Sequence, residues 1–148
     1  MTRPSNKSTI LIADTPGQLL LMELMLASEE HQVVKVEDGR EVLAYLRSHT
    51  PDLIILDINM PYLSGLDLCA RVKHVQRLKN IPVILVTSLR DQRVKGSEPI
   101  VKPDAVLEKP LDSTTFRETI NRFLESPIVS PDPLSRTRSP GEWSVSKY

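Results

Sequence analysis

One short apolar run constrains the fold of this chain more than any other feature. Residues 53–56 read Leu-Ile-Ile-Leu, a Pro-Asp turn signal precedes them at 51–52, and a loop containing Pro61 follows. An uninterrupted apolar run of this length between turn signals is typical of a strand buried on both faces, as in a parallel sheet. Asp57 then stands where the strand leaves the core, either as a functional carboxylate or as a cap of the following turn.

Strand and helix patterns alternate along the rest of the chain. Further β-branched and apolar runs predict strands over 9–13, 32–36, 81–88 and 105–108. Periodic apolar positions predict helices over 18–30, from Gly39 to before Pro51, from Gly65 to near Asn80, and from Asp112 to Leu124. Prolines at 99 and 103 restrict any helix after the fourth strand to a short segment, residues 89–95. This order predicts an α/β fold with five parallel strands and helices on both faces.

Length and composition favour a single domain. The chain has 148 residues, with 19 Lys and Arg against 19 Asp and Glu, so it lacks the basic field that holds nucleic acid or an anionic membrane. Its single cysteine allows no intrachain disulfide, and the amino terminus carries no signal pattern. A soluble cytoplasmic protein is therefore expected.

The sequence divides into three segments. Residues 1–8 are expected to form a flexible N-terminus, and residues 9–126 the folded domain. Residues 127–148 contain several Pro, Ser and Arg residues and are expected to be a disordered tail, because they cannot build a core of their own. Trp143 and Tyr148 belong either to an inert end or to a short docking segment for a partner or for the domain's own surface.

Polar residues stand at the ends of four predicted strands: Asp14, Asp57, Thr87 and Lys109. Because the carboxyl ends of parallel strands lie at one edge of a sheet, these side chains are expected to converge. Two carboxylates with a backbone carbonyl just beyond Asp57 can hold Mg²⁺, which prefers oxygen ligands. A carboxylate can also attack a phosphoryl group if a metal, a lysine and a hydroxyl neutralise the charge on its oxygens. Lys109 and Thr87 fit the last two roles.

Taken singly, these residues also have ordinary structural explanations. Asp14 could cap the first helix, and Lys109 could be a surface cation. Thr87 could be an ordinary strand residue whose hydroxyl forms a hydrogen bond with the backbone. The three histidines, at 31, 49 and 74, form no cluster in the sequence and are expected at the surface. Cys69 is expected to be a small buried hydrophobe.

Four motifs carry a resemblance to a known family. They are Ile-Leu-Ile-Ala-Asp at 10–14, Asp-Leu-Ile-Ile-Leu-Asp-Ile-Asn-Met-Pro at 52–61 with Gly65, Val-Thr-Ser at 86–88, and Leu-Glu-Lys-Pro at 107–110. In order and spacing together, residues 9–124 resemble the CheY-like receiver domain of two-component response regulators. The resemblance implies a doubly wound, flavodoxin-like sheet with strand order 2-1-3-4-5.

The resemblance also implies a role for each matching residue. Asp57 would accept a phosphoryl group from a histidine kinase or a phosphotransfer protein. Asp14, Asp57 and the carbonyl of Asn59 would bind Mg²⁺. Thr87 would sense the phosphoryl group, and Lys109 would contact it ahead of a cis prolyl peptide bond.

Two residues depart from the family's pattern. Ala13 stands where the first of two acids is expected, so the affinity for Mg²⁺ is expected to be reduced, although Asp14, the direct ligand by the family's pattern, is retained. Val106 stands where a Tyr or Phe usually rotates to couple phosphorylation to the output face. Valine has no large ring to rotate, so any switch must use another element.

The favoured function is a stand-alone receiver that signals by contact with an unknown downstream protein. Its only catalysis would be Mg²⁺-dependent self-phosphorylation and autodephosphorylation, and a homodimer through the last strand and helix would follow a habit of the family. The alternative is a pseudo-receiver, an interaction module that works without phosphorylation.

Two enzymatic functions fit the sequence poorly. A haloacid-dehalogenase-type phosphatase needs a second aspartate as general acid where this chain has Asn59. Flavin-based electron transfer needs a hydroxyl- and glycine-rich phosphate loop after the first strand, and this chain has none there.

Overall fold

A computed structural model describes residues 8–27, 31–88 and 102–124 of the chain. The strands are β1 (Ser8–Ala13), β2 (His31–Val36), β3 (Leu53–Asp57), β4 (Val83–Thr87) and β5 (Ala105–Glu108). The helices in the described residues are α1 (Pro16–Met25), α2 (Gly39–Leu46), α3 (Gly65–His74) and α5 (Ser113–Asn121). The short helix predicted over 89–95 and the tail predicted over 127–148 lie outside the described residues.

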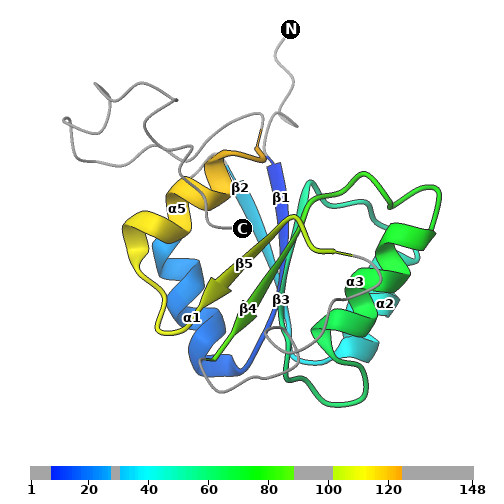
Figure 1. The fold of residues 1–148 in the computed structure, drawn as a ribbon, viewed down its shortest axis with the longest axis horizontal. Coiled ribbons are helices and arrows are strands. Elements are labelled where there is room, and N and C mark those ends of the chain that lie inside the picture. The colour runs from blue at the N-terminus through cyan, green and yellow to red at the C-terminus, as the bar shows by residue number, and fades with distance from the viewer. Residues whose placement is uncertain (1–7, 28–30, 89–101, 125–148) are drawn as a thin grey trace, which may run out of the picture.

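The five strands form one sheet in the order β2-β1-β3-β4-β5, and every neighbouring pair is parallel. Figure 1 shows α1 and α5 on one face of this sheet and α2 and α3 on the other. The predicted fold class and strand order are therefore confirmed. Among the described helices, none has the length and apolar character needed to cross a lipid bilayer.

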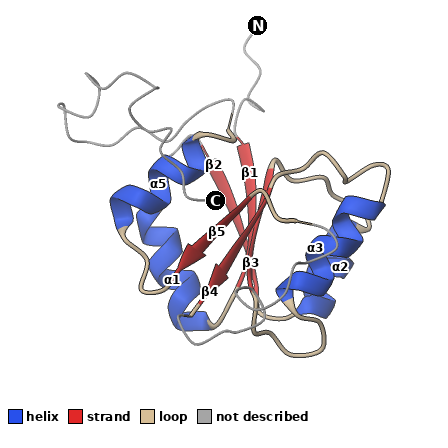
Figure 2. Cartoon of the chain, in the orientation of Figure 1, coloured by secondary structure: helices blue, strands red, loops and turns tan. Residues whose placement is uncertain are grey.

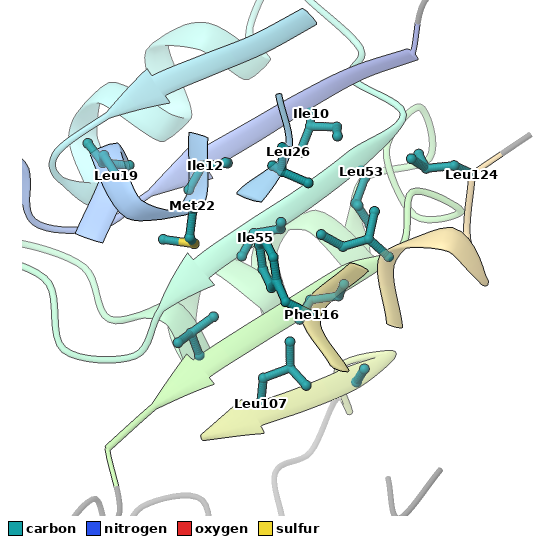
Figure 3. Packing of buried hydrophobic residues seen from close by; sticks show 14 residues of the cluster. Ile10, Ile12, Leu19, Met22, Leu26, Leu53, Ile55, Leu107, Phe116 and Leu124 are labelled. Atoms are coloured by element: carbon teal, nitrogen blue, oxygen red, sulfur yellow. The ribbon is translucent and has the colours of Figure 1, made fainter. Parts of the chain in front are cut away.

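Alternation along the buried strands creates two apolar layers. Ile10, Ile12, Leu53 and Ile55 pack with α1 and α5, and Figure 3 shows these side chains meeting Met22 and Phe116. The intervening residues of the same strands belong to the layer under α2 and α3: Leu11, Ala13, Ile54 and Leu56. Since successive side chains point to opposite faces of a sheet, β3 can be apolar from Leu53 to Leu56 only because both of its faces are covered.

Each described helix begins at a polar cap. The capping side chains that accept a backbone N–H in the first turn are Thr15, Asp38, Ser64 and Asp112. Such caps satisfy donors that have no partner within the helix, and they fix where each helix leaves the sheet edge. The predicted starts at Gly39 and Gly65 are correct, whereas α1 begins two residues before the predicted residue 18 and α5 one residue after the predicted Asp112.

The predicted end of α3 near Asn80 is wrong. The helix ends at His74 because Val75 adopts extended backbone angles, and the chain continues as turns to Asn80. Leu78 is buried within those turns, so the apolar pattern continues beyond the helix itself. Val75, the first residue after the helix, is 42% exposed.

The expectation that all three histidines lie at the surface is also wrong. His31 is the first residue of β2, pairs with Ser8 of β1 and is buried. His49 and His74 are exposed as expected.

Candidate functional site

The carboxyl ends of the strands meet at the lower edge of the sheet in Figure 2. Asp14 follows β1, Asp57 is the last residue of β3, and Lys109 follows β5. Lys109 Nζ donates to Asp14 Oδ1 at 3.2 Å and lies 3.7 Å from Asp57 Oδ1. The structure thus brings together two buried carboxylates and one cation from three separate strands.

The backbone fixes the position of Lys109. Its N–H donates to the carbonyl of Thr87 at 2.8 Å, which continues the β4–β5 ladder by one residue. The peptide bond between Lys109 and Pro110 is cis, as the resemblance to receiver domains implies. The lysine side chain is 21% exposed, and it reaches from the rim of the sheet to the two carboxylates.

Asp57 is held in an environment that disfavours its charge. Burial, together with the nearby charge of Asp14, raises the pKa of Asp57 from 3.8 to about 6. The Lys109 ammonium and the N–H of Asn59, which donates to Asp57 Oδ1 at 3.3 Å, act in the opposite direction. The two favourable partners therefore do not fully offset desolvation and the neighbouring carboxylate.

Asp14 provides an observation that bears on cation binding. Its side chain is buried, and Oδ1 accepts from the N–H of Thr15 at 2.7 Å as well as from Lys109. Among the described residues, no hydrogen-bond donor reaches Asp14 Oδ2. A buried carboxylate oxygen without a donor is unfavourable by itself and suits a cation ligand.

The donor set fits Mg²⁺ better than a softer metal. The carboxylates of Asp14 and Asp57 are hard oxygen ligands, and Mg²⁺ commonly uses one or two carboxylates and keeps several waters. Within the described ranges, no group of three or more His, Cys, Asp or Glu side chains is placed to hold a metal. A partly hydrated Mg²⁺ is therefore the cation that these residues suit.

Thr87 lies at the same edge but is oriented differently. It is buried as the last residue of β4, and its hydroxyl donates to the carbonyl of Ser88 at 3.1 Å. Its hydroxyl proton is directed to its neighbour and not to Asp57. The structure therefore places Thr87 close to the site in the sheet without joining it to the carboxylates.

The two departures from the family's pattern have clear structural settings. Ala13 is fully buried and lies between Val36 and Leu56 in the sheet, within the apolar layer under α2 and α3. Val106 pairs with Leu85 and is partly buried against the same layer. Both positions are occupied by small apolar side chains that complete the packing.

Gly65 brings α3 into direct contact with the site. Its N–H donates to the carbonyl of Ile58 at 3.0 Å, and a Cβ at this position would lie 2.6 Å from the carbonyl oxygen of Asp57. No real Cβ tolerates such a distance, so any larger residue must displace the backbone. The sequence motif included Gly65 without indicating this contact.

Two contacts between the start of α2 and the loop after β3 could not be predicted from the sequence. Tyr62 has φ 74, an uncommon value for a residue other than glycine, and the Arg40 guanidinium lies 3.5 Å from the centre of its ring. Gly39, at the start of α2, packs so closely on Leu63 that a Cβ would lie 2.7 Å from the Leu63 Cβ. The only signal in the sequence is the glycine, because spacing alone does not reveal contacts between two loops.

Known proteins share this architecture. The family model described as "Response regulator receiver domain" matches residues 9–121. The polar-differentiation response regulator DivK of Brucella ovis is 31% identical over 121 residues, which cover 80% of this chain and 96% of DivK.

Two solved structures are similar as well. The signal receiver domain of a signal transduction histidine kinase from Syntrophus aciditrophicus is 32% identical, with TM-score 0.72, over 83% of this chain and 97% of that one. The phosphorylated cyanobacterial phytochrome response regulator RcpA is 27% identical, with TM-score 0.70, over 85% and 99%. With the four motifs and the strand order, these matches show that the chain belongs to the family of response regulator receiver domains.

Proposed function

We propose that this chain accepts a phosphoryl group on Asp57 from the phosphohistidine of a histidine kinase or phosphotransfer protein, and then signals by protein contact. The observation that carries the proposal is the placement of the Asp57 carboxylate at the end of β3, beside Asp14 and 3.7 Å from Lys109 Nζ. Receiver domains act as signalling modules, and the similarity to phosphorylated RcpA supports the same chemistry here.

The transfer requires a nucleophile and charge neutralisation. An oxygen of the Asp57 carboxylate forms a bond to phosphorus while the phosphorus–nitrogen bond of the donor breaks, and the electron pair returns to the imidazole. Negative charge on the transferring oxygens is then balanced by the Lys109 ammonium and by a hydrogen bond from Thr87. For this the Thr87 hydroxyl must turn away from Ser88, to which it donates in this structure.

Receiver domains typically bind Mg²⁺, and we place its site at Asp14, Asp57 and the carbonyl of Asn59. The buried Oδ2 of Asp14, without a donor among the described residues, supports this assignment. Bound there, Mg²⁺ supplies positive charge to the carboxylate and to the incoming phosphoryl oxygens. Ala13 removes one negative charge relative to the family's pattern, so the affinity is expected to be reduced.

Intact mass spectrometry after incubation with Mg²⁺ and acetyl phosphate tests the assignment. The parent chain is expected to gain one phosphoryl group, whereas the Asp57→Asn variant gains none. Asp52→Asn, a change of the same type at the opposite edge of the sheet, serves as the control and retains the gain. Equal labelling of the parent and Asp57→Asn would refute the site.

A pseudo-receiver is the second candidate, and two observations favour it. Ala13 is fully buried among apolar side chains, and Val106 offers no ring to couple the site to the output face. In that case the parent gains no mass with acetyl phosphate or with candidate kinases, and its partners bind equally to the parent and to Asp57→Asn.

We further propose that one domain spans residues 9–126, flanked by residues 1–8 and by the 127–148 tail. The match of the family model to residues 9–121 supports these limits. We place the protein in the cytoplasm, where ATP is available to histidine kinases, and expect a protein target and not nucleic acid, since Lys and Arg balance Asp and Glu. Homodimerisation through β5 and α5 remains a further proposal.

A further inference from the structure

Helix α1 is apolar on two opposite faces. Leu19, Met22 and Leu26 point into the core between α1 and the sheet, as Figure 3 shows. Leu20, Leu21 and Leu24 are 58%, 38% and 66% exposed, and at 100° per residue they centre on the side of the helix opposite the core. We name these three residues the outer leucine stripe.

A stripe of this kind is unusual for a helix at the surface. Surface helices carry polar residues on the side away from the core, whereas a helix that is apolar all round is normally covered. Between Pro16 and Met25 the only polar side chains are those of Gln18 and Glu23. Glu23 is engaged in an ion pair with Lys35 at 2.8 Å. The composition of α1 therefore indicates that another apolar segment covers the stripe.

The end of α5 lies next to α1. Arg117 Nη1 donates to the carbonyl of Met25, in the last turn of α1, at 3.2 Å. Leu124, the last described residue, is buried in the same apolar cluster as Leu26. Figure 1 shows the two helices side by side on one face of the sheet. The residues that follow 124 therefore start beside the carboxyl end of α1.

The sequence that follows can reach the stripe and match its character. Residues 125–134 read Glu-Ser-Pro-Ile-Val-Ser-Pro-Asp-Pro-Leu, with apolar side chains at 128, 129 and 134. Four extended residues from Leu124 to Ile128 span ~13 Å, more than the ~8–10 Å between packed helix axes. Leu20 and Leu24 lie only ~6 Å apart along the helix axis, so a short segment covers both.

Three prolines favour binding as an extended strand. Each proline fixes its own φ near one value, so less conformational entropy is lost when the segment becomes ordered. The segment carries only two charged residues, Glu125 and Asp132, which suits a surface without charge. We propose that residues 125–134 dock on the outer leucine stripe, with Ile128 and Val129 against Leu24 and with Leu134 nearer Leu20.

The proposal goes beyond the phosphotransfer assigned above and does not depend on it. Docking is a contact within the chain, and it is measured without any phosphoryl donor. Its consequence is regulatory, because a protein that binds the outer leucine stripe must displace residues 125–134. Since α1 begins two residues after Asp14, such a partner would lie beside the candidate site.

Methyl NMR on the full chain tests this contact directly. Nuclear Overhauser effects are expected between the Ile128 methyls and those of Leu24, because docked side chains lie within van der Waals distance. The double change Ile128→Ser with Val129→Ser should abolish them and shift the Leu20 and Leu24 methyl resonances. Val145→Ser, an apolar-to-polar change in the same tail beyond the segment, is the matched control and should leave them in place.

Two results would overturn the proposal. Absent effects, together with Leu20 and Leu24 resonances that are equal in the parent and in the double variant, would mean that the segment does not cover the stripe. Effects found only between differently labelled copies, and lost on dilution, would assign the stripe to a second copy of the chain. Failure of Asp57 phosphorylation would change neither readout.

Discussion

Aspartates lie at both ends of the strands of this parallel sheet, and their carboxylates are bonded differently at the two ends. At the end where the strands begin, which we call the amino edge, Asp52 and Asp104 each bridge two neighbouring strands. Thr9 N–H donates to Asp52 Oδ2 at 2.7 Å, while Asp52 N–H donates to the Thr9 carbonyl at 2.8 Å. Asp104 repeats this reciprocal pair with Val83 at 2.7 and 2.8 Å. At this edge a carboxylate replaces a missing ladder bond.

At the carboxyl edge, two buried carboxylates share one lysine. Asp14 retains a buried oxygen without a donor among the described residues, and the pKa of Asp57 is raised to about 6. Aspartate thus stabilises the amino edge and is unfavourable in its charged form at the carboxyl edge, because the number of hydrogen-bond donors to the carboxylates and their degree of burial differ. Unfavourable electrostatics of this kind concentrate where a sheet binds charged ligands.

The largest effect is expected at the amino edge. Asp104→Ala should lower the free energy of unfolding by ~2–3 kcal/mol, because it leaves the N–H of Val83 without its acceptor and the ammonium of Lys73 with only the Ile81 carbonyl. Chemical denaturation at pH 7 measures the loss. Lys73→Met, which preserves the bond from Val83 to Asp104, is the control and should cost less. A larger loss for Lys73→Met than for Asp104→Ala would contradict this account.

A change of opposite sign is expected at the carboxyl edge. Asp57→Asn should raise the free energy of unfolding at pH 7 by ~1–3 kcal/mol in metal-free buffer, since the gap between 3.8 and about 6 corresponds to ~3 kcal/mol. The folded chain binds the proton more tightly than the unfolded chain. The stability contributed by protonated Asp57 is therefore complete below pH 3.8 and is lost as the pH rises through about 6.

Denaturation curves across this range give the measurement. The difference in stability between Asp57→Asn and the parent should grow between pH 4 and pH 6.5 and then level off. If the two curves run parallel over that window, Asp57 is not the strained group. Asp104→Asn should show no such gain at pH 7, because its carboxylate is favourably bonded.

The smallest effect concerns Mg²⁺. At a concentration ten times its dissociation constant, Mg²⁺ should stabilise the parent by ~1.4 kcal/mol. Asp14→Asn and Asp57→Asn should gain clearly less, whereas Asp52→Asn at the opposite edge should gain as much as the parent. Denaturation with and without Mg²⁺ measures this, and equal stabilisation of all four proteins would place the cation elsewhere.

Much of the fold could be predicted from the sequence, because strand burial and helix caps are local signals. The apolar run before Asp57 specified a central strand, and apolar periodicity specified α2 and α3 from their first residues, Gly39 and Gly65. The end of α3 was harder to predict, since Leu78 extends the apolar pattern into a turn. Hydrophobicity alone also could not separate the inward leucines of α1 from the outward ones.

For the candidate site, the sequence predicted which residues share one end of the sheet but not the contacts between them. Topology alone brings Asp14, Asp57 and Lys109 to one edge. Which carboxylate is nearer to Lys109 depends on side-chain packing, and the structure places Asp14 nearer than Asp57. The direction of the Thr87 hydroxyl is likewise set by a local choice of acceptor.

The contact of Gly65 with the backbone of Asp57 constrains how this family member can vary. The bond from Gly65 N–H to the Ile58 carbonyl closes the loop between β3 and α3 into a ring. A residue inserted between Asn59 and Ser64 would have to bulge out of the loop, because the hydrogen bond between Gly65 and Ile58 fixes the distance between the loop's ends. A substitution in the loop does not change the number of residues between these two ends. The side chains of this loop, and therefore the proteins that bind it, can change by substitution while the length of the loop stays constant.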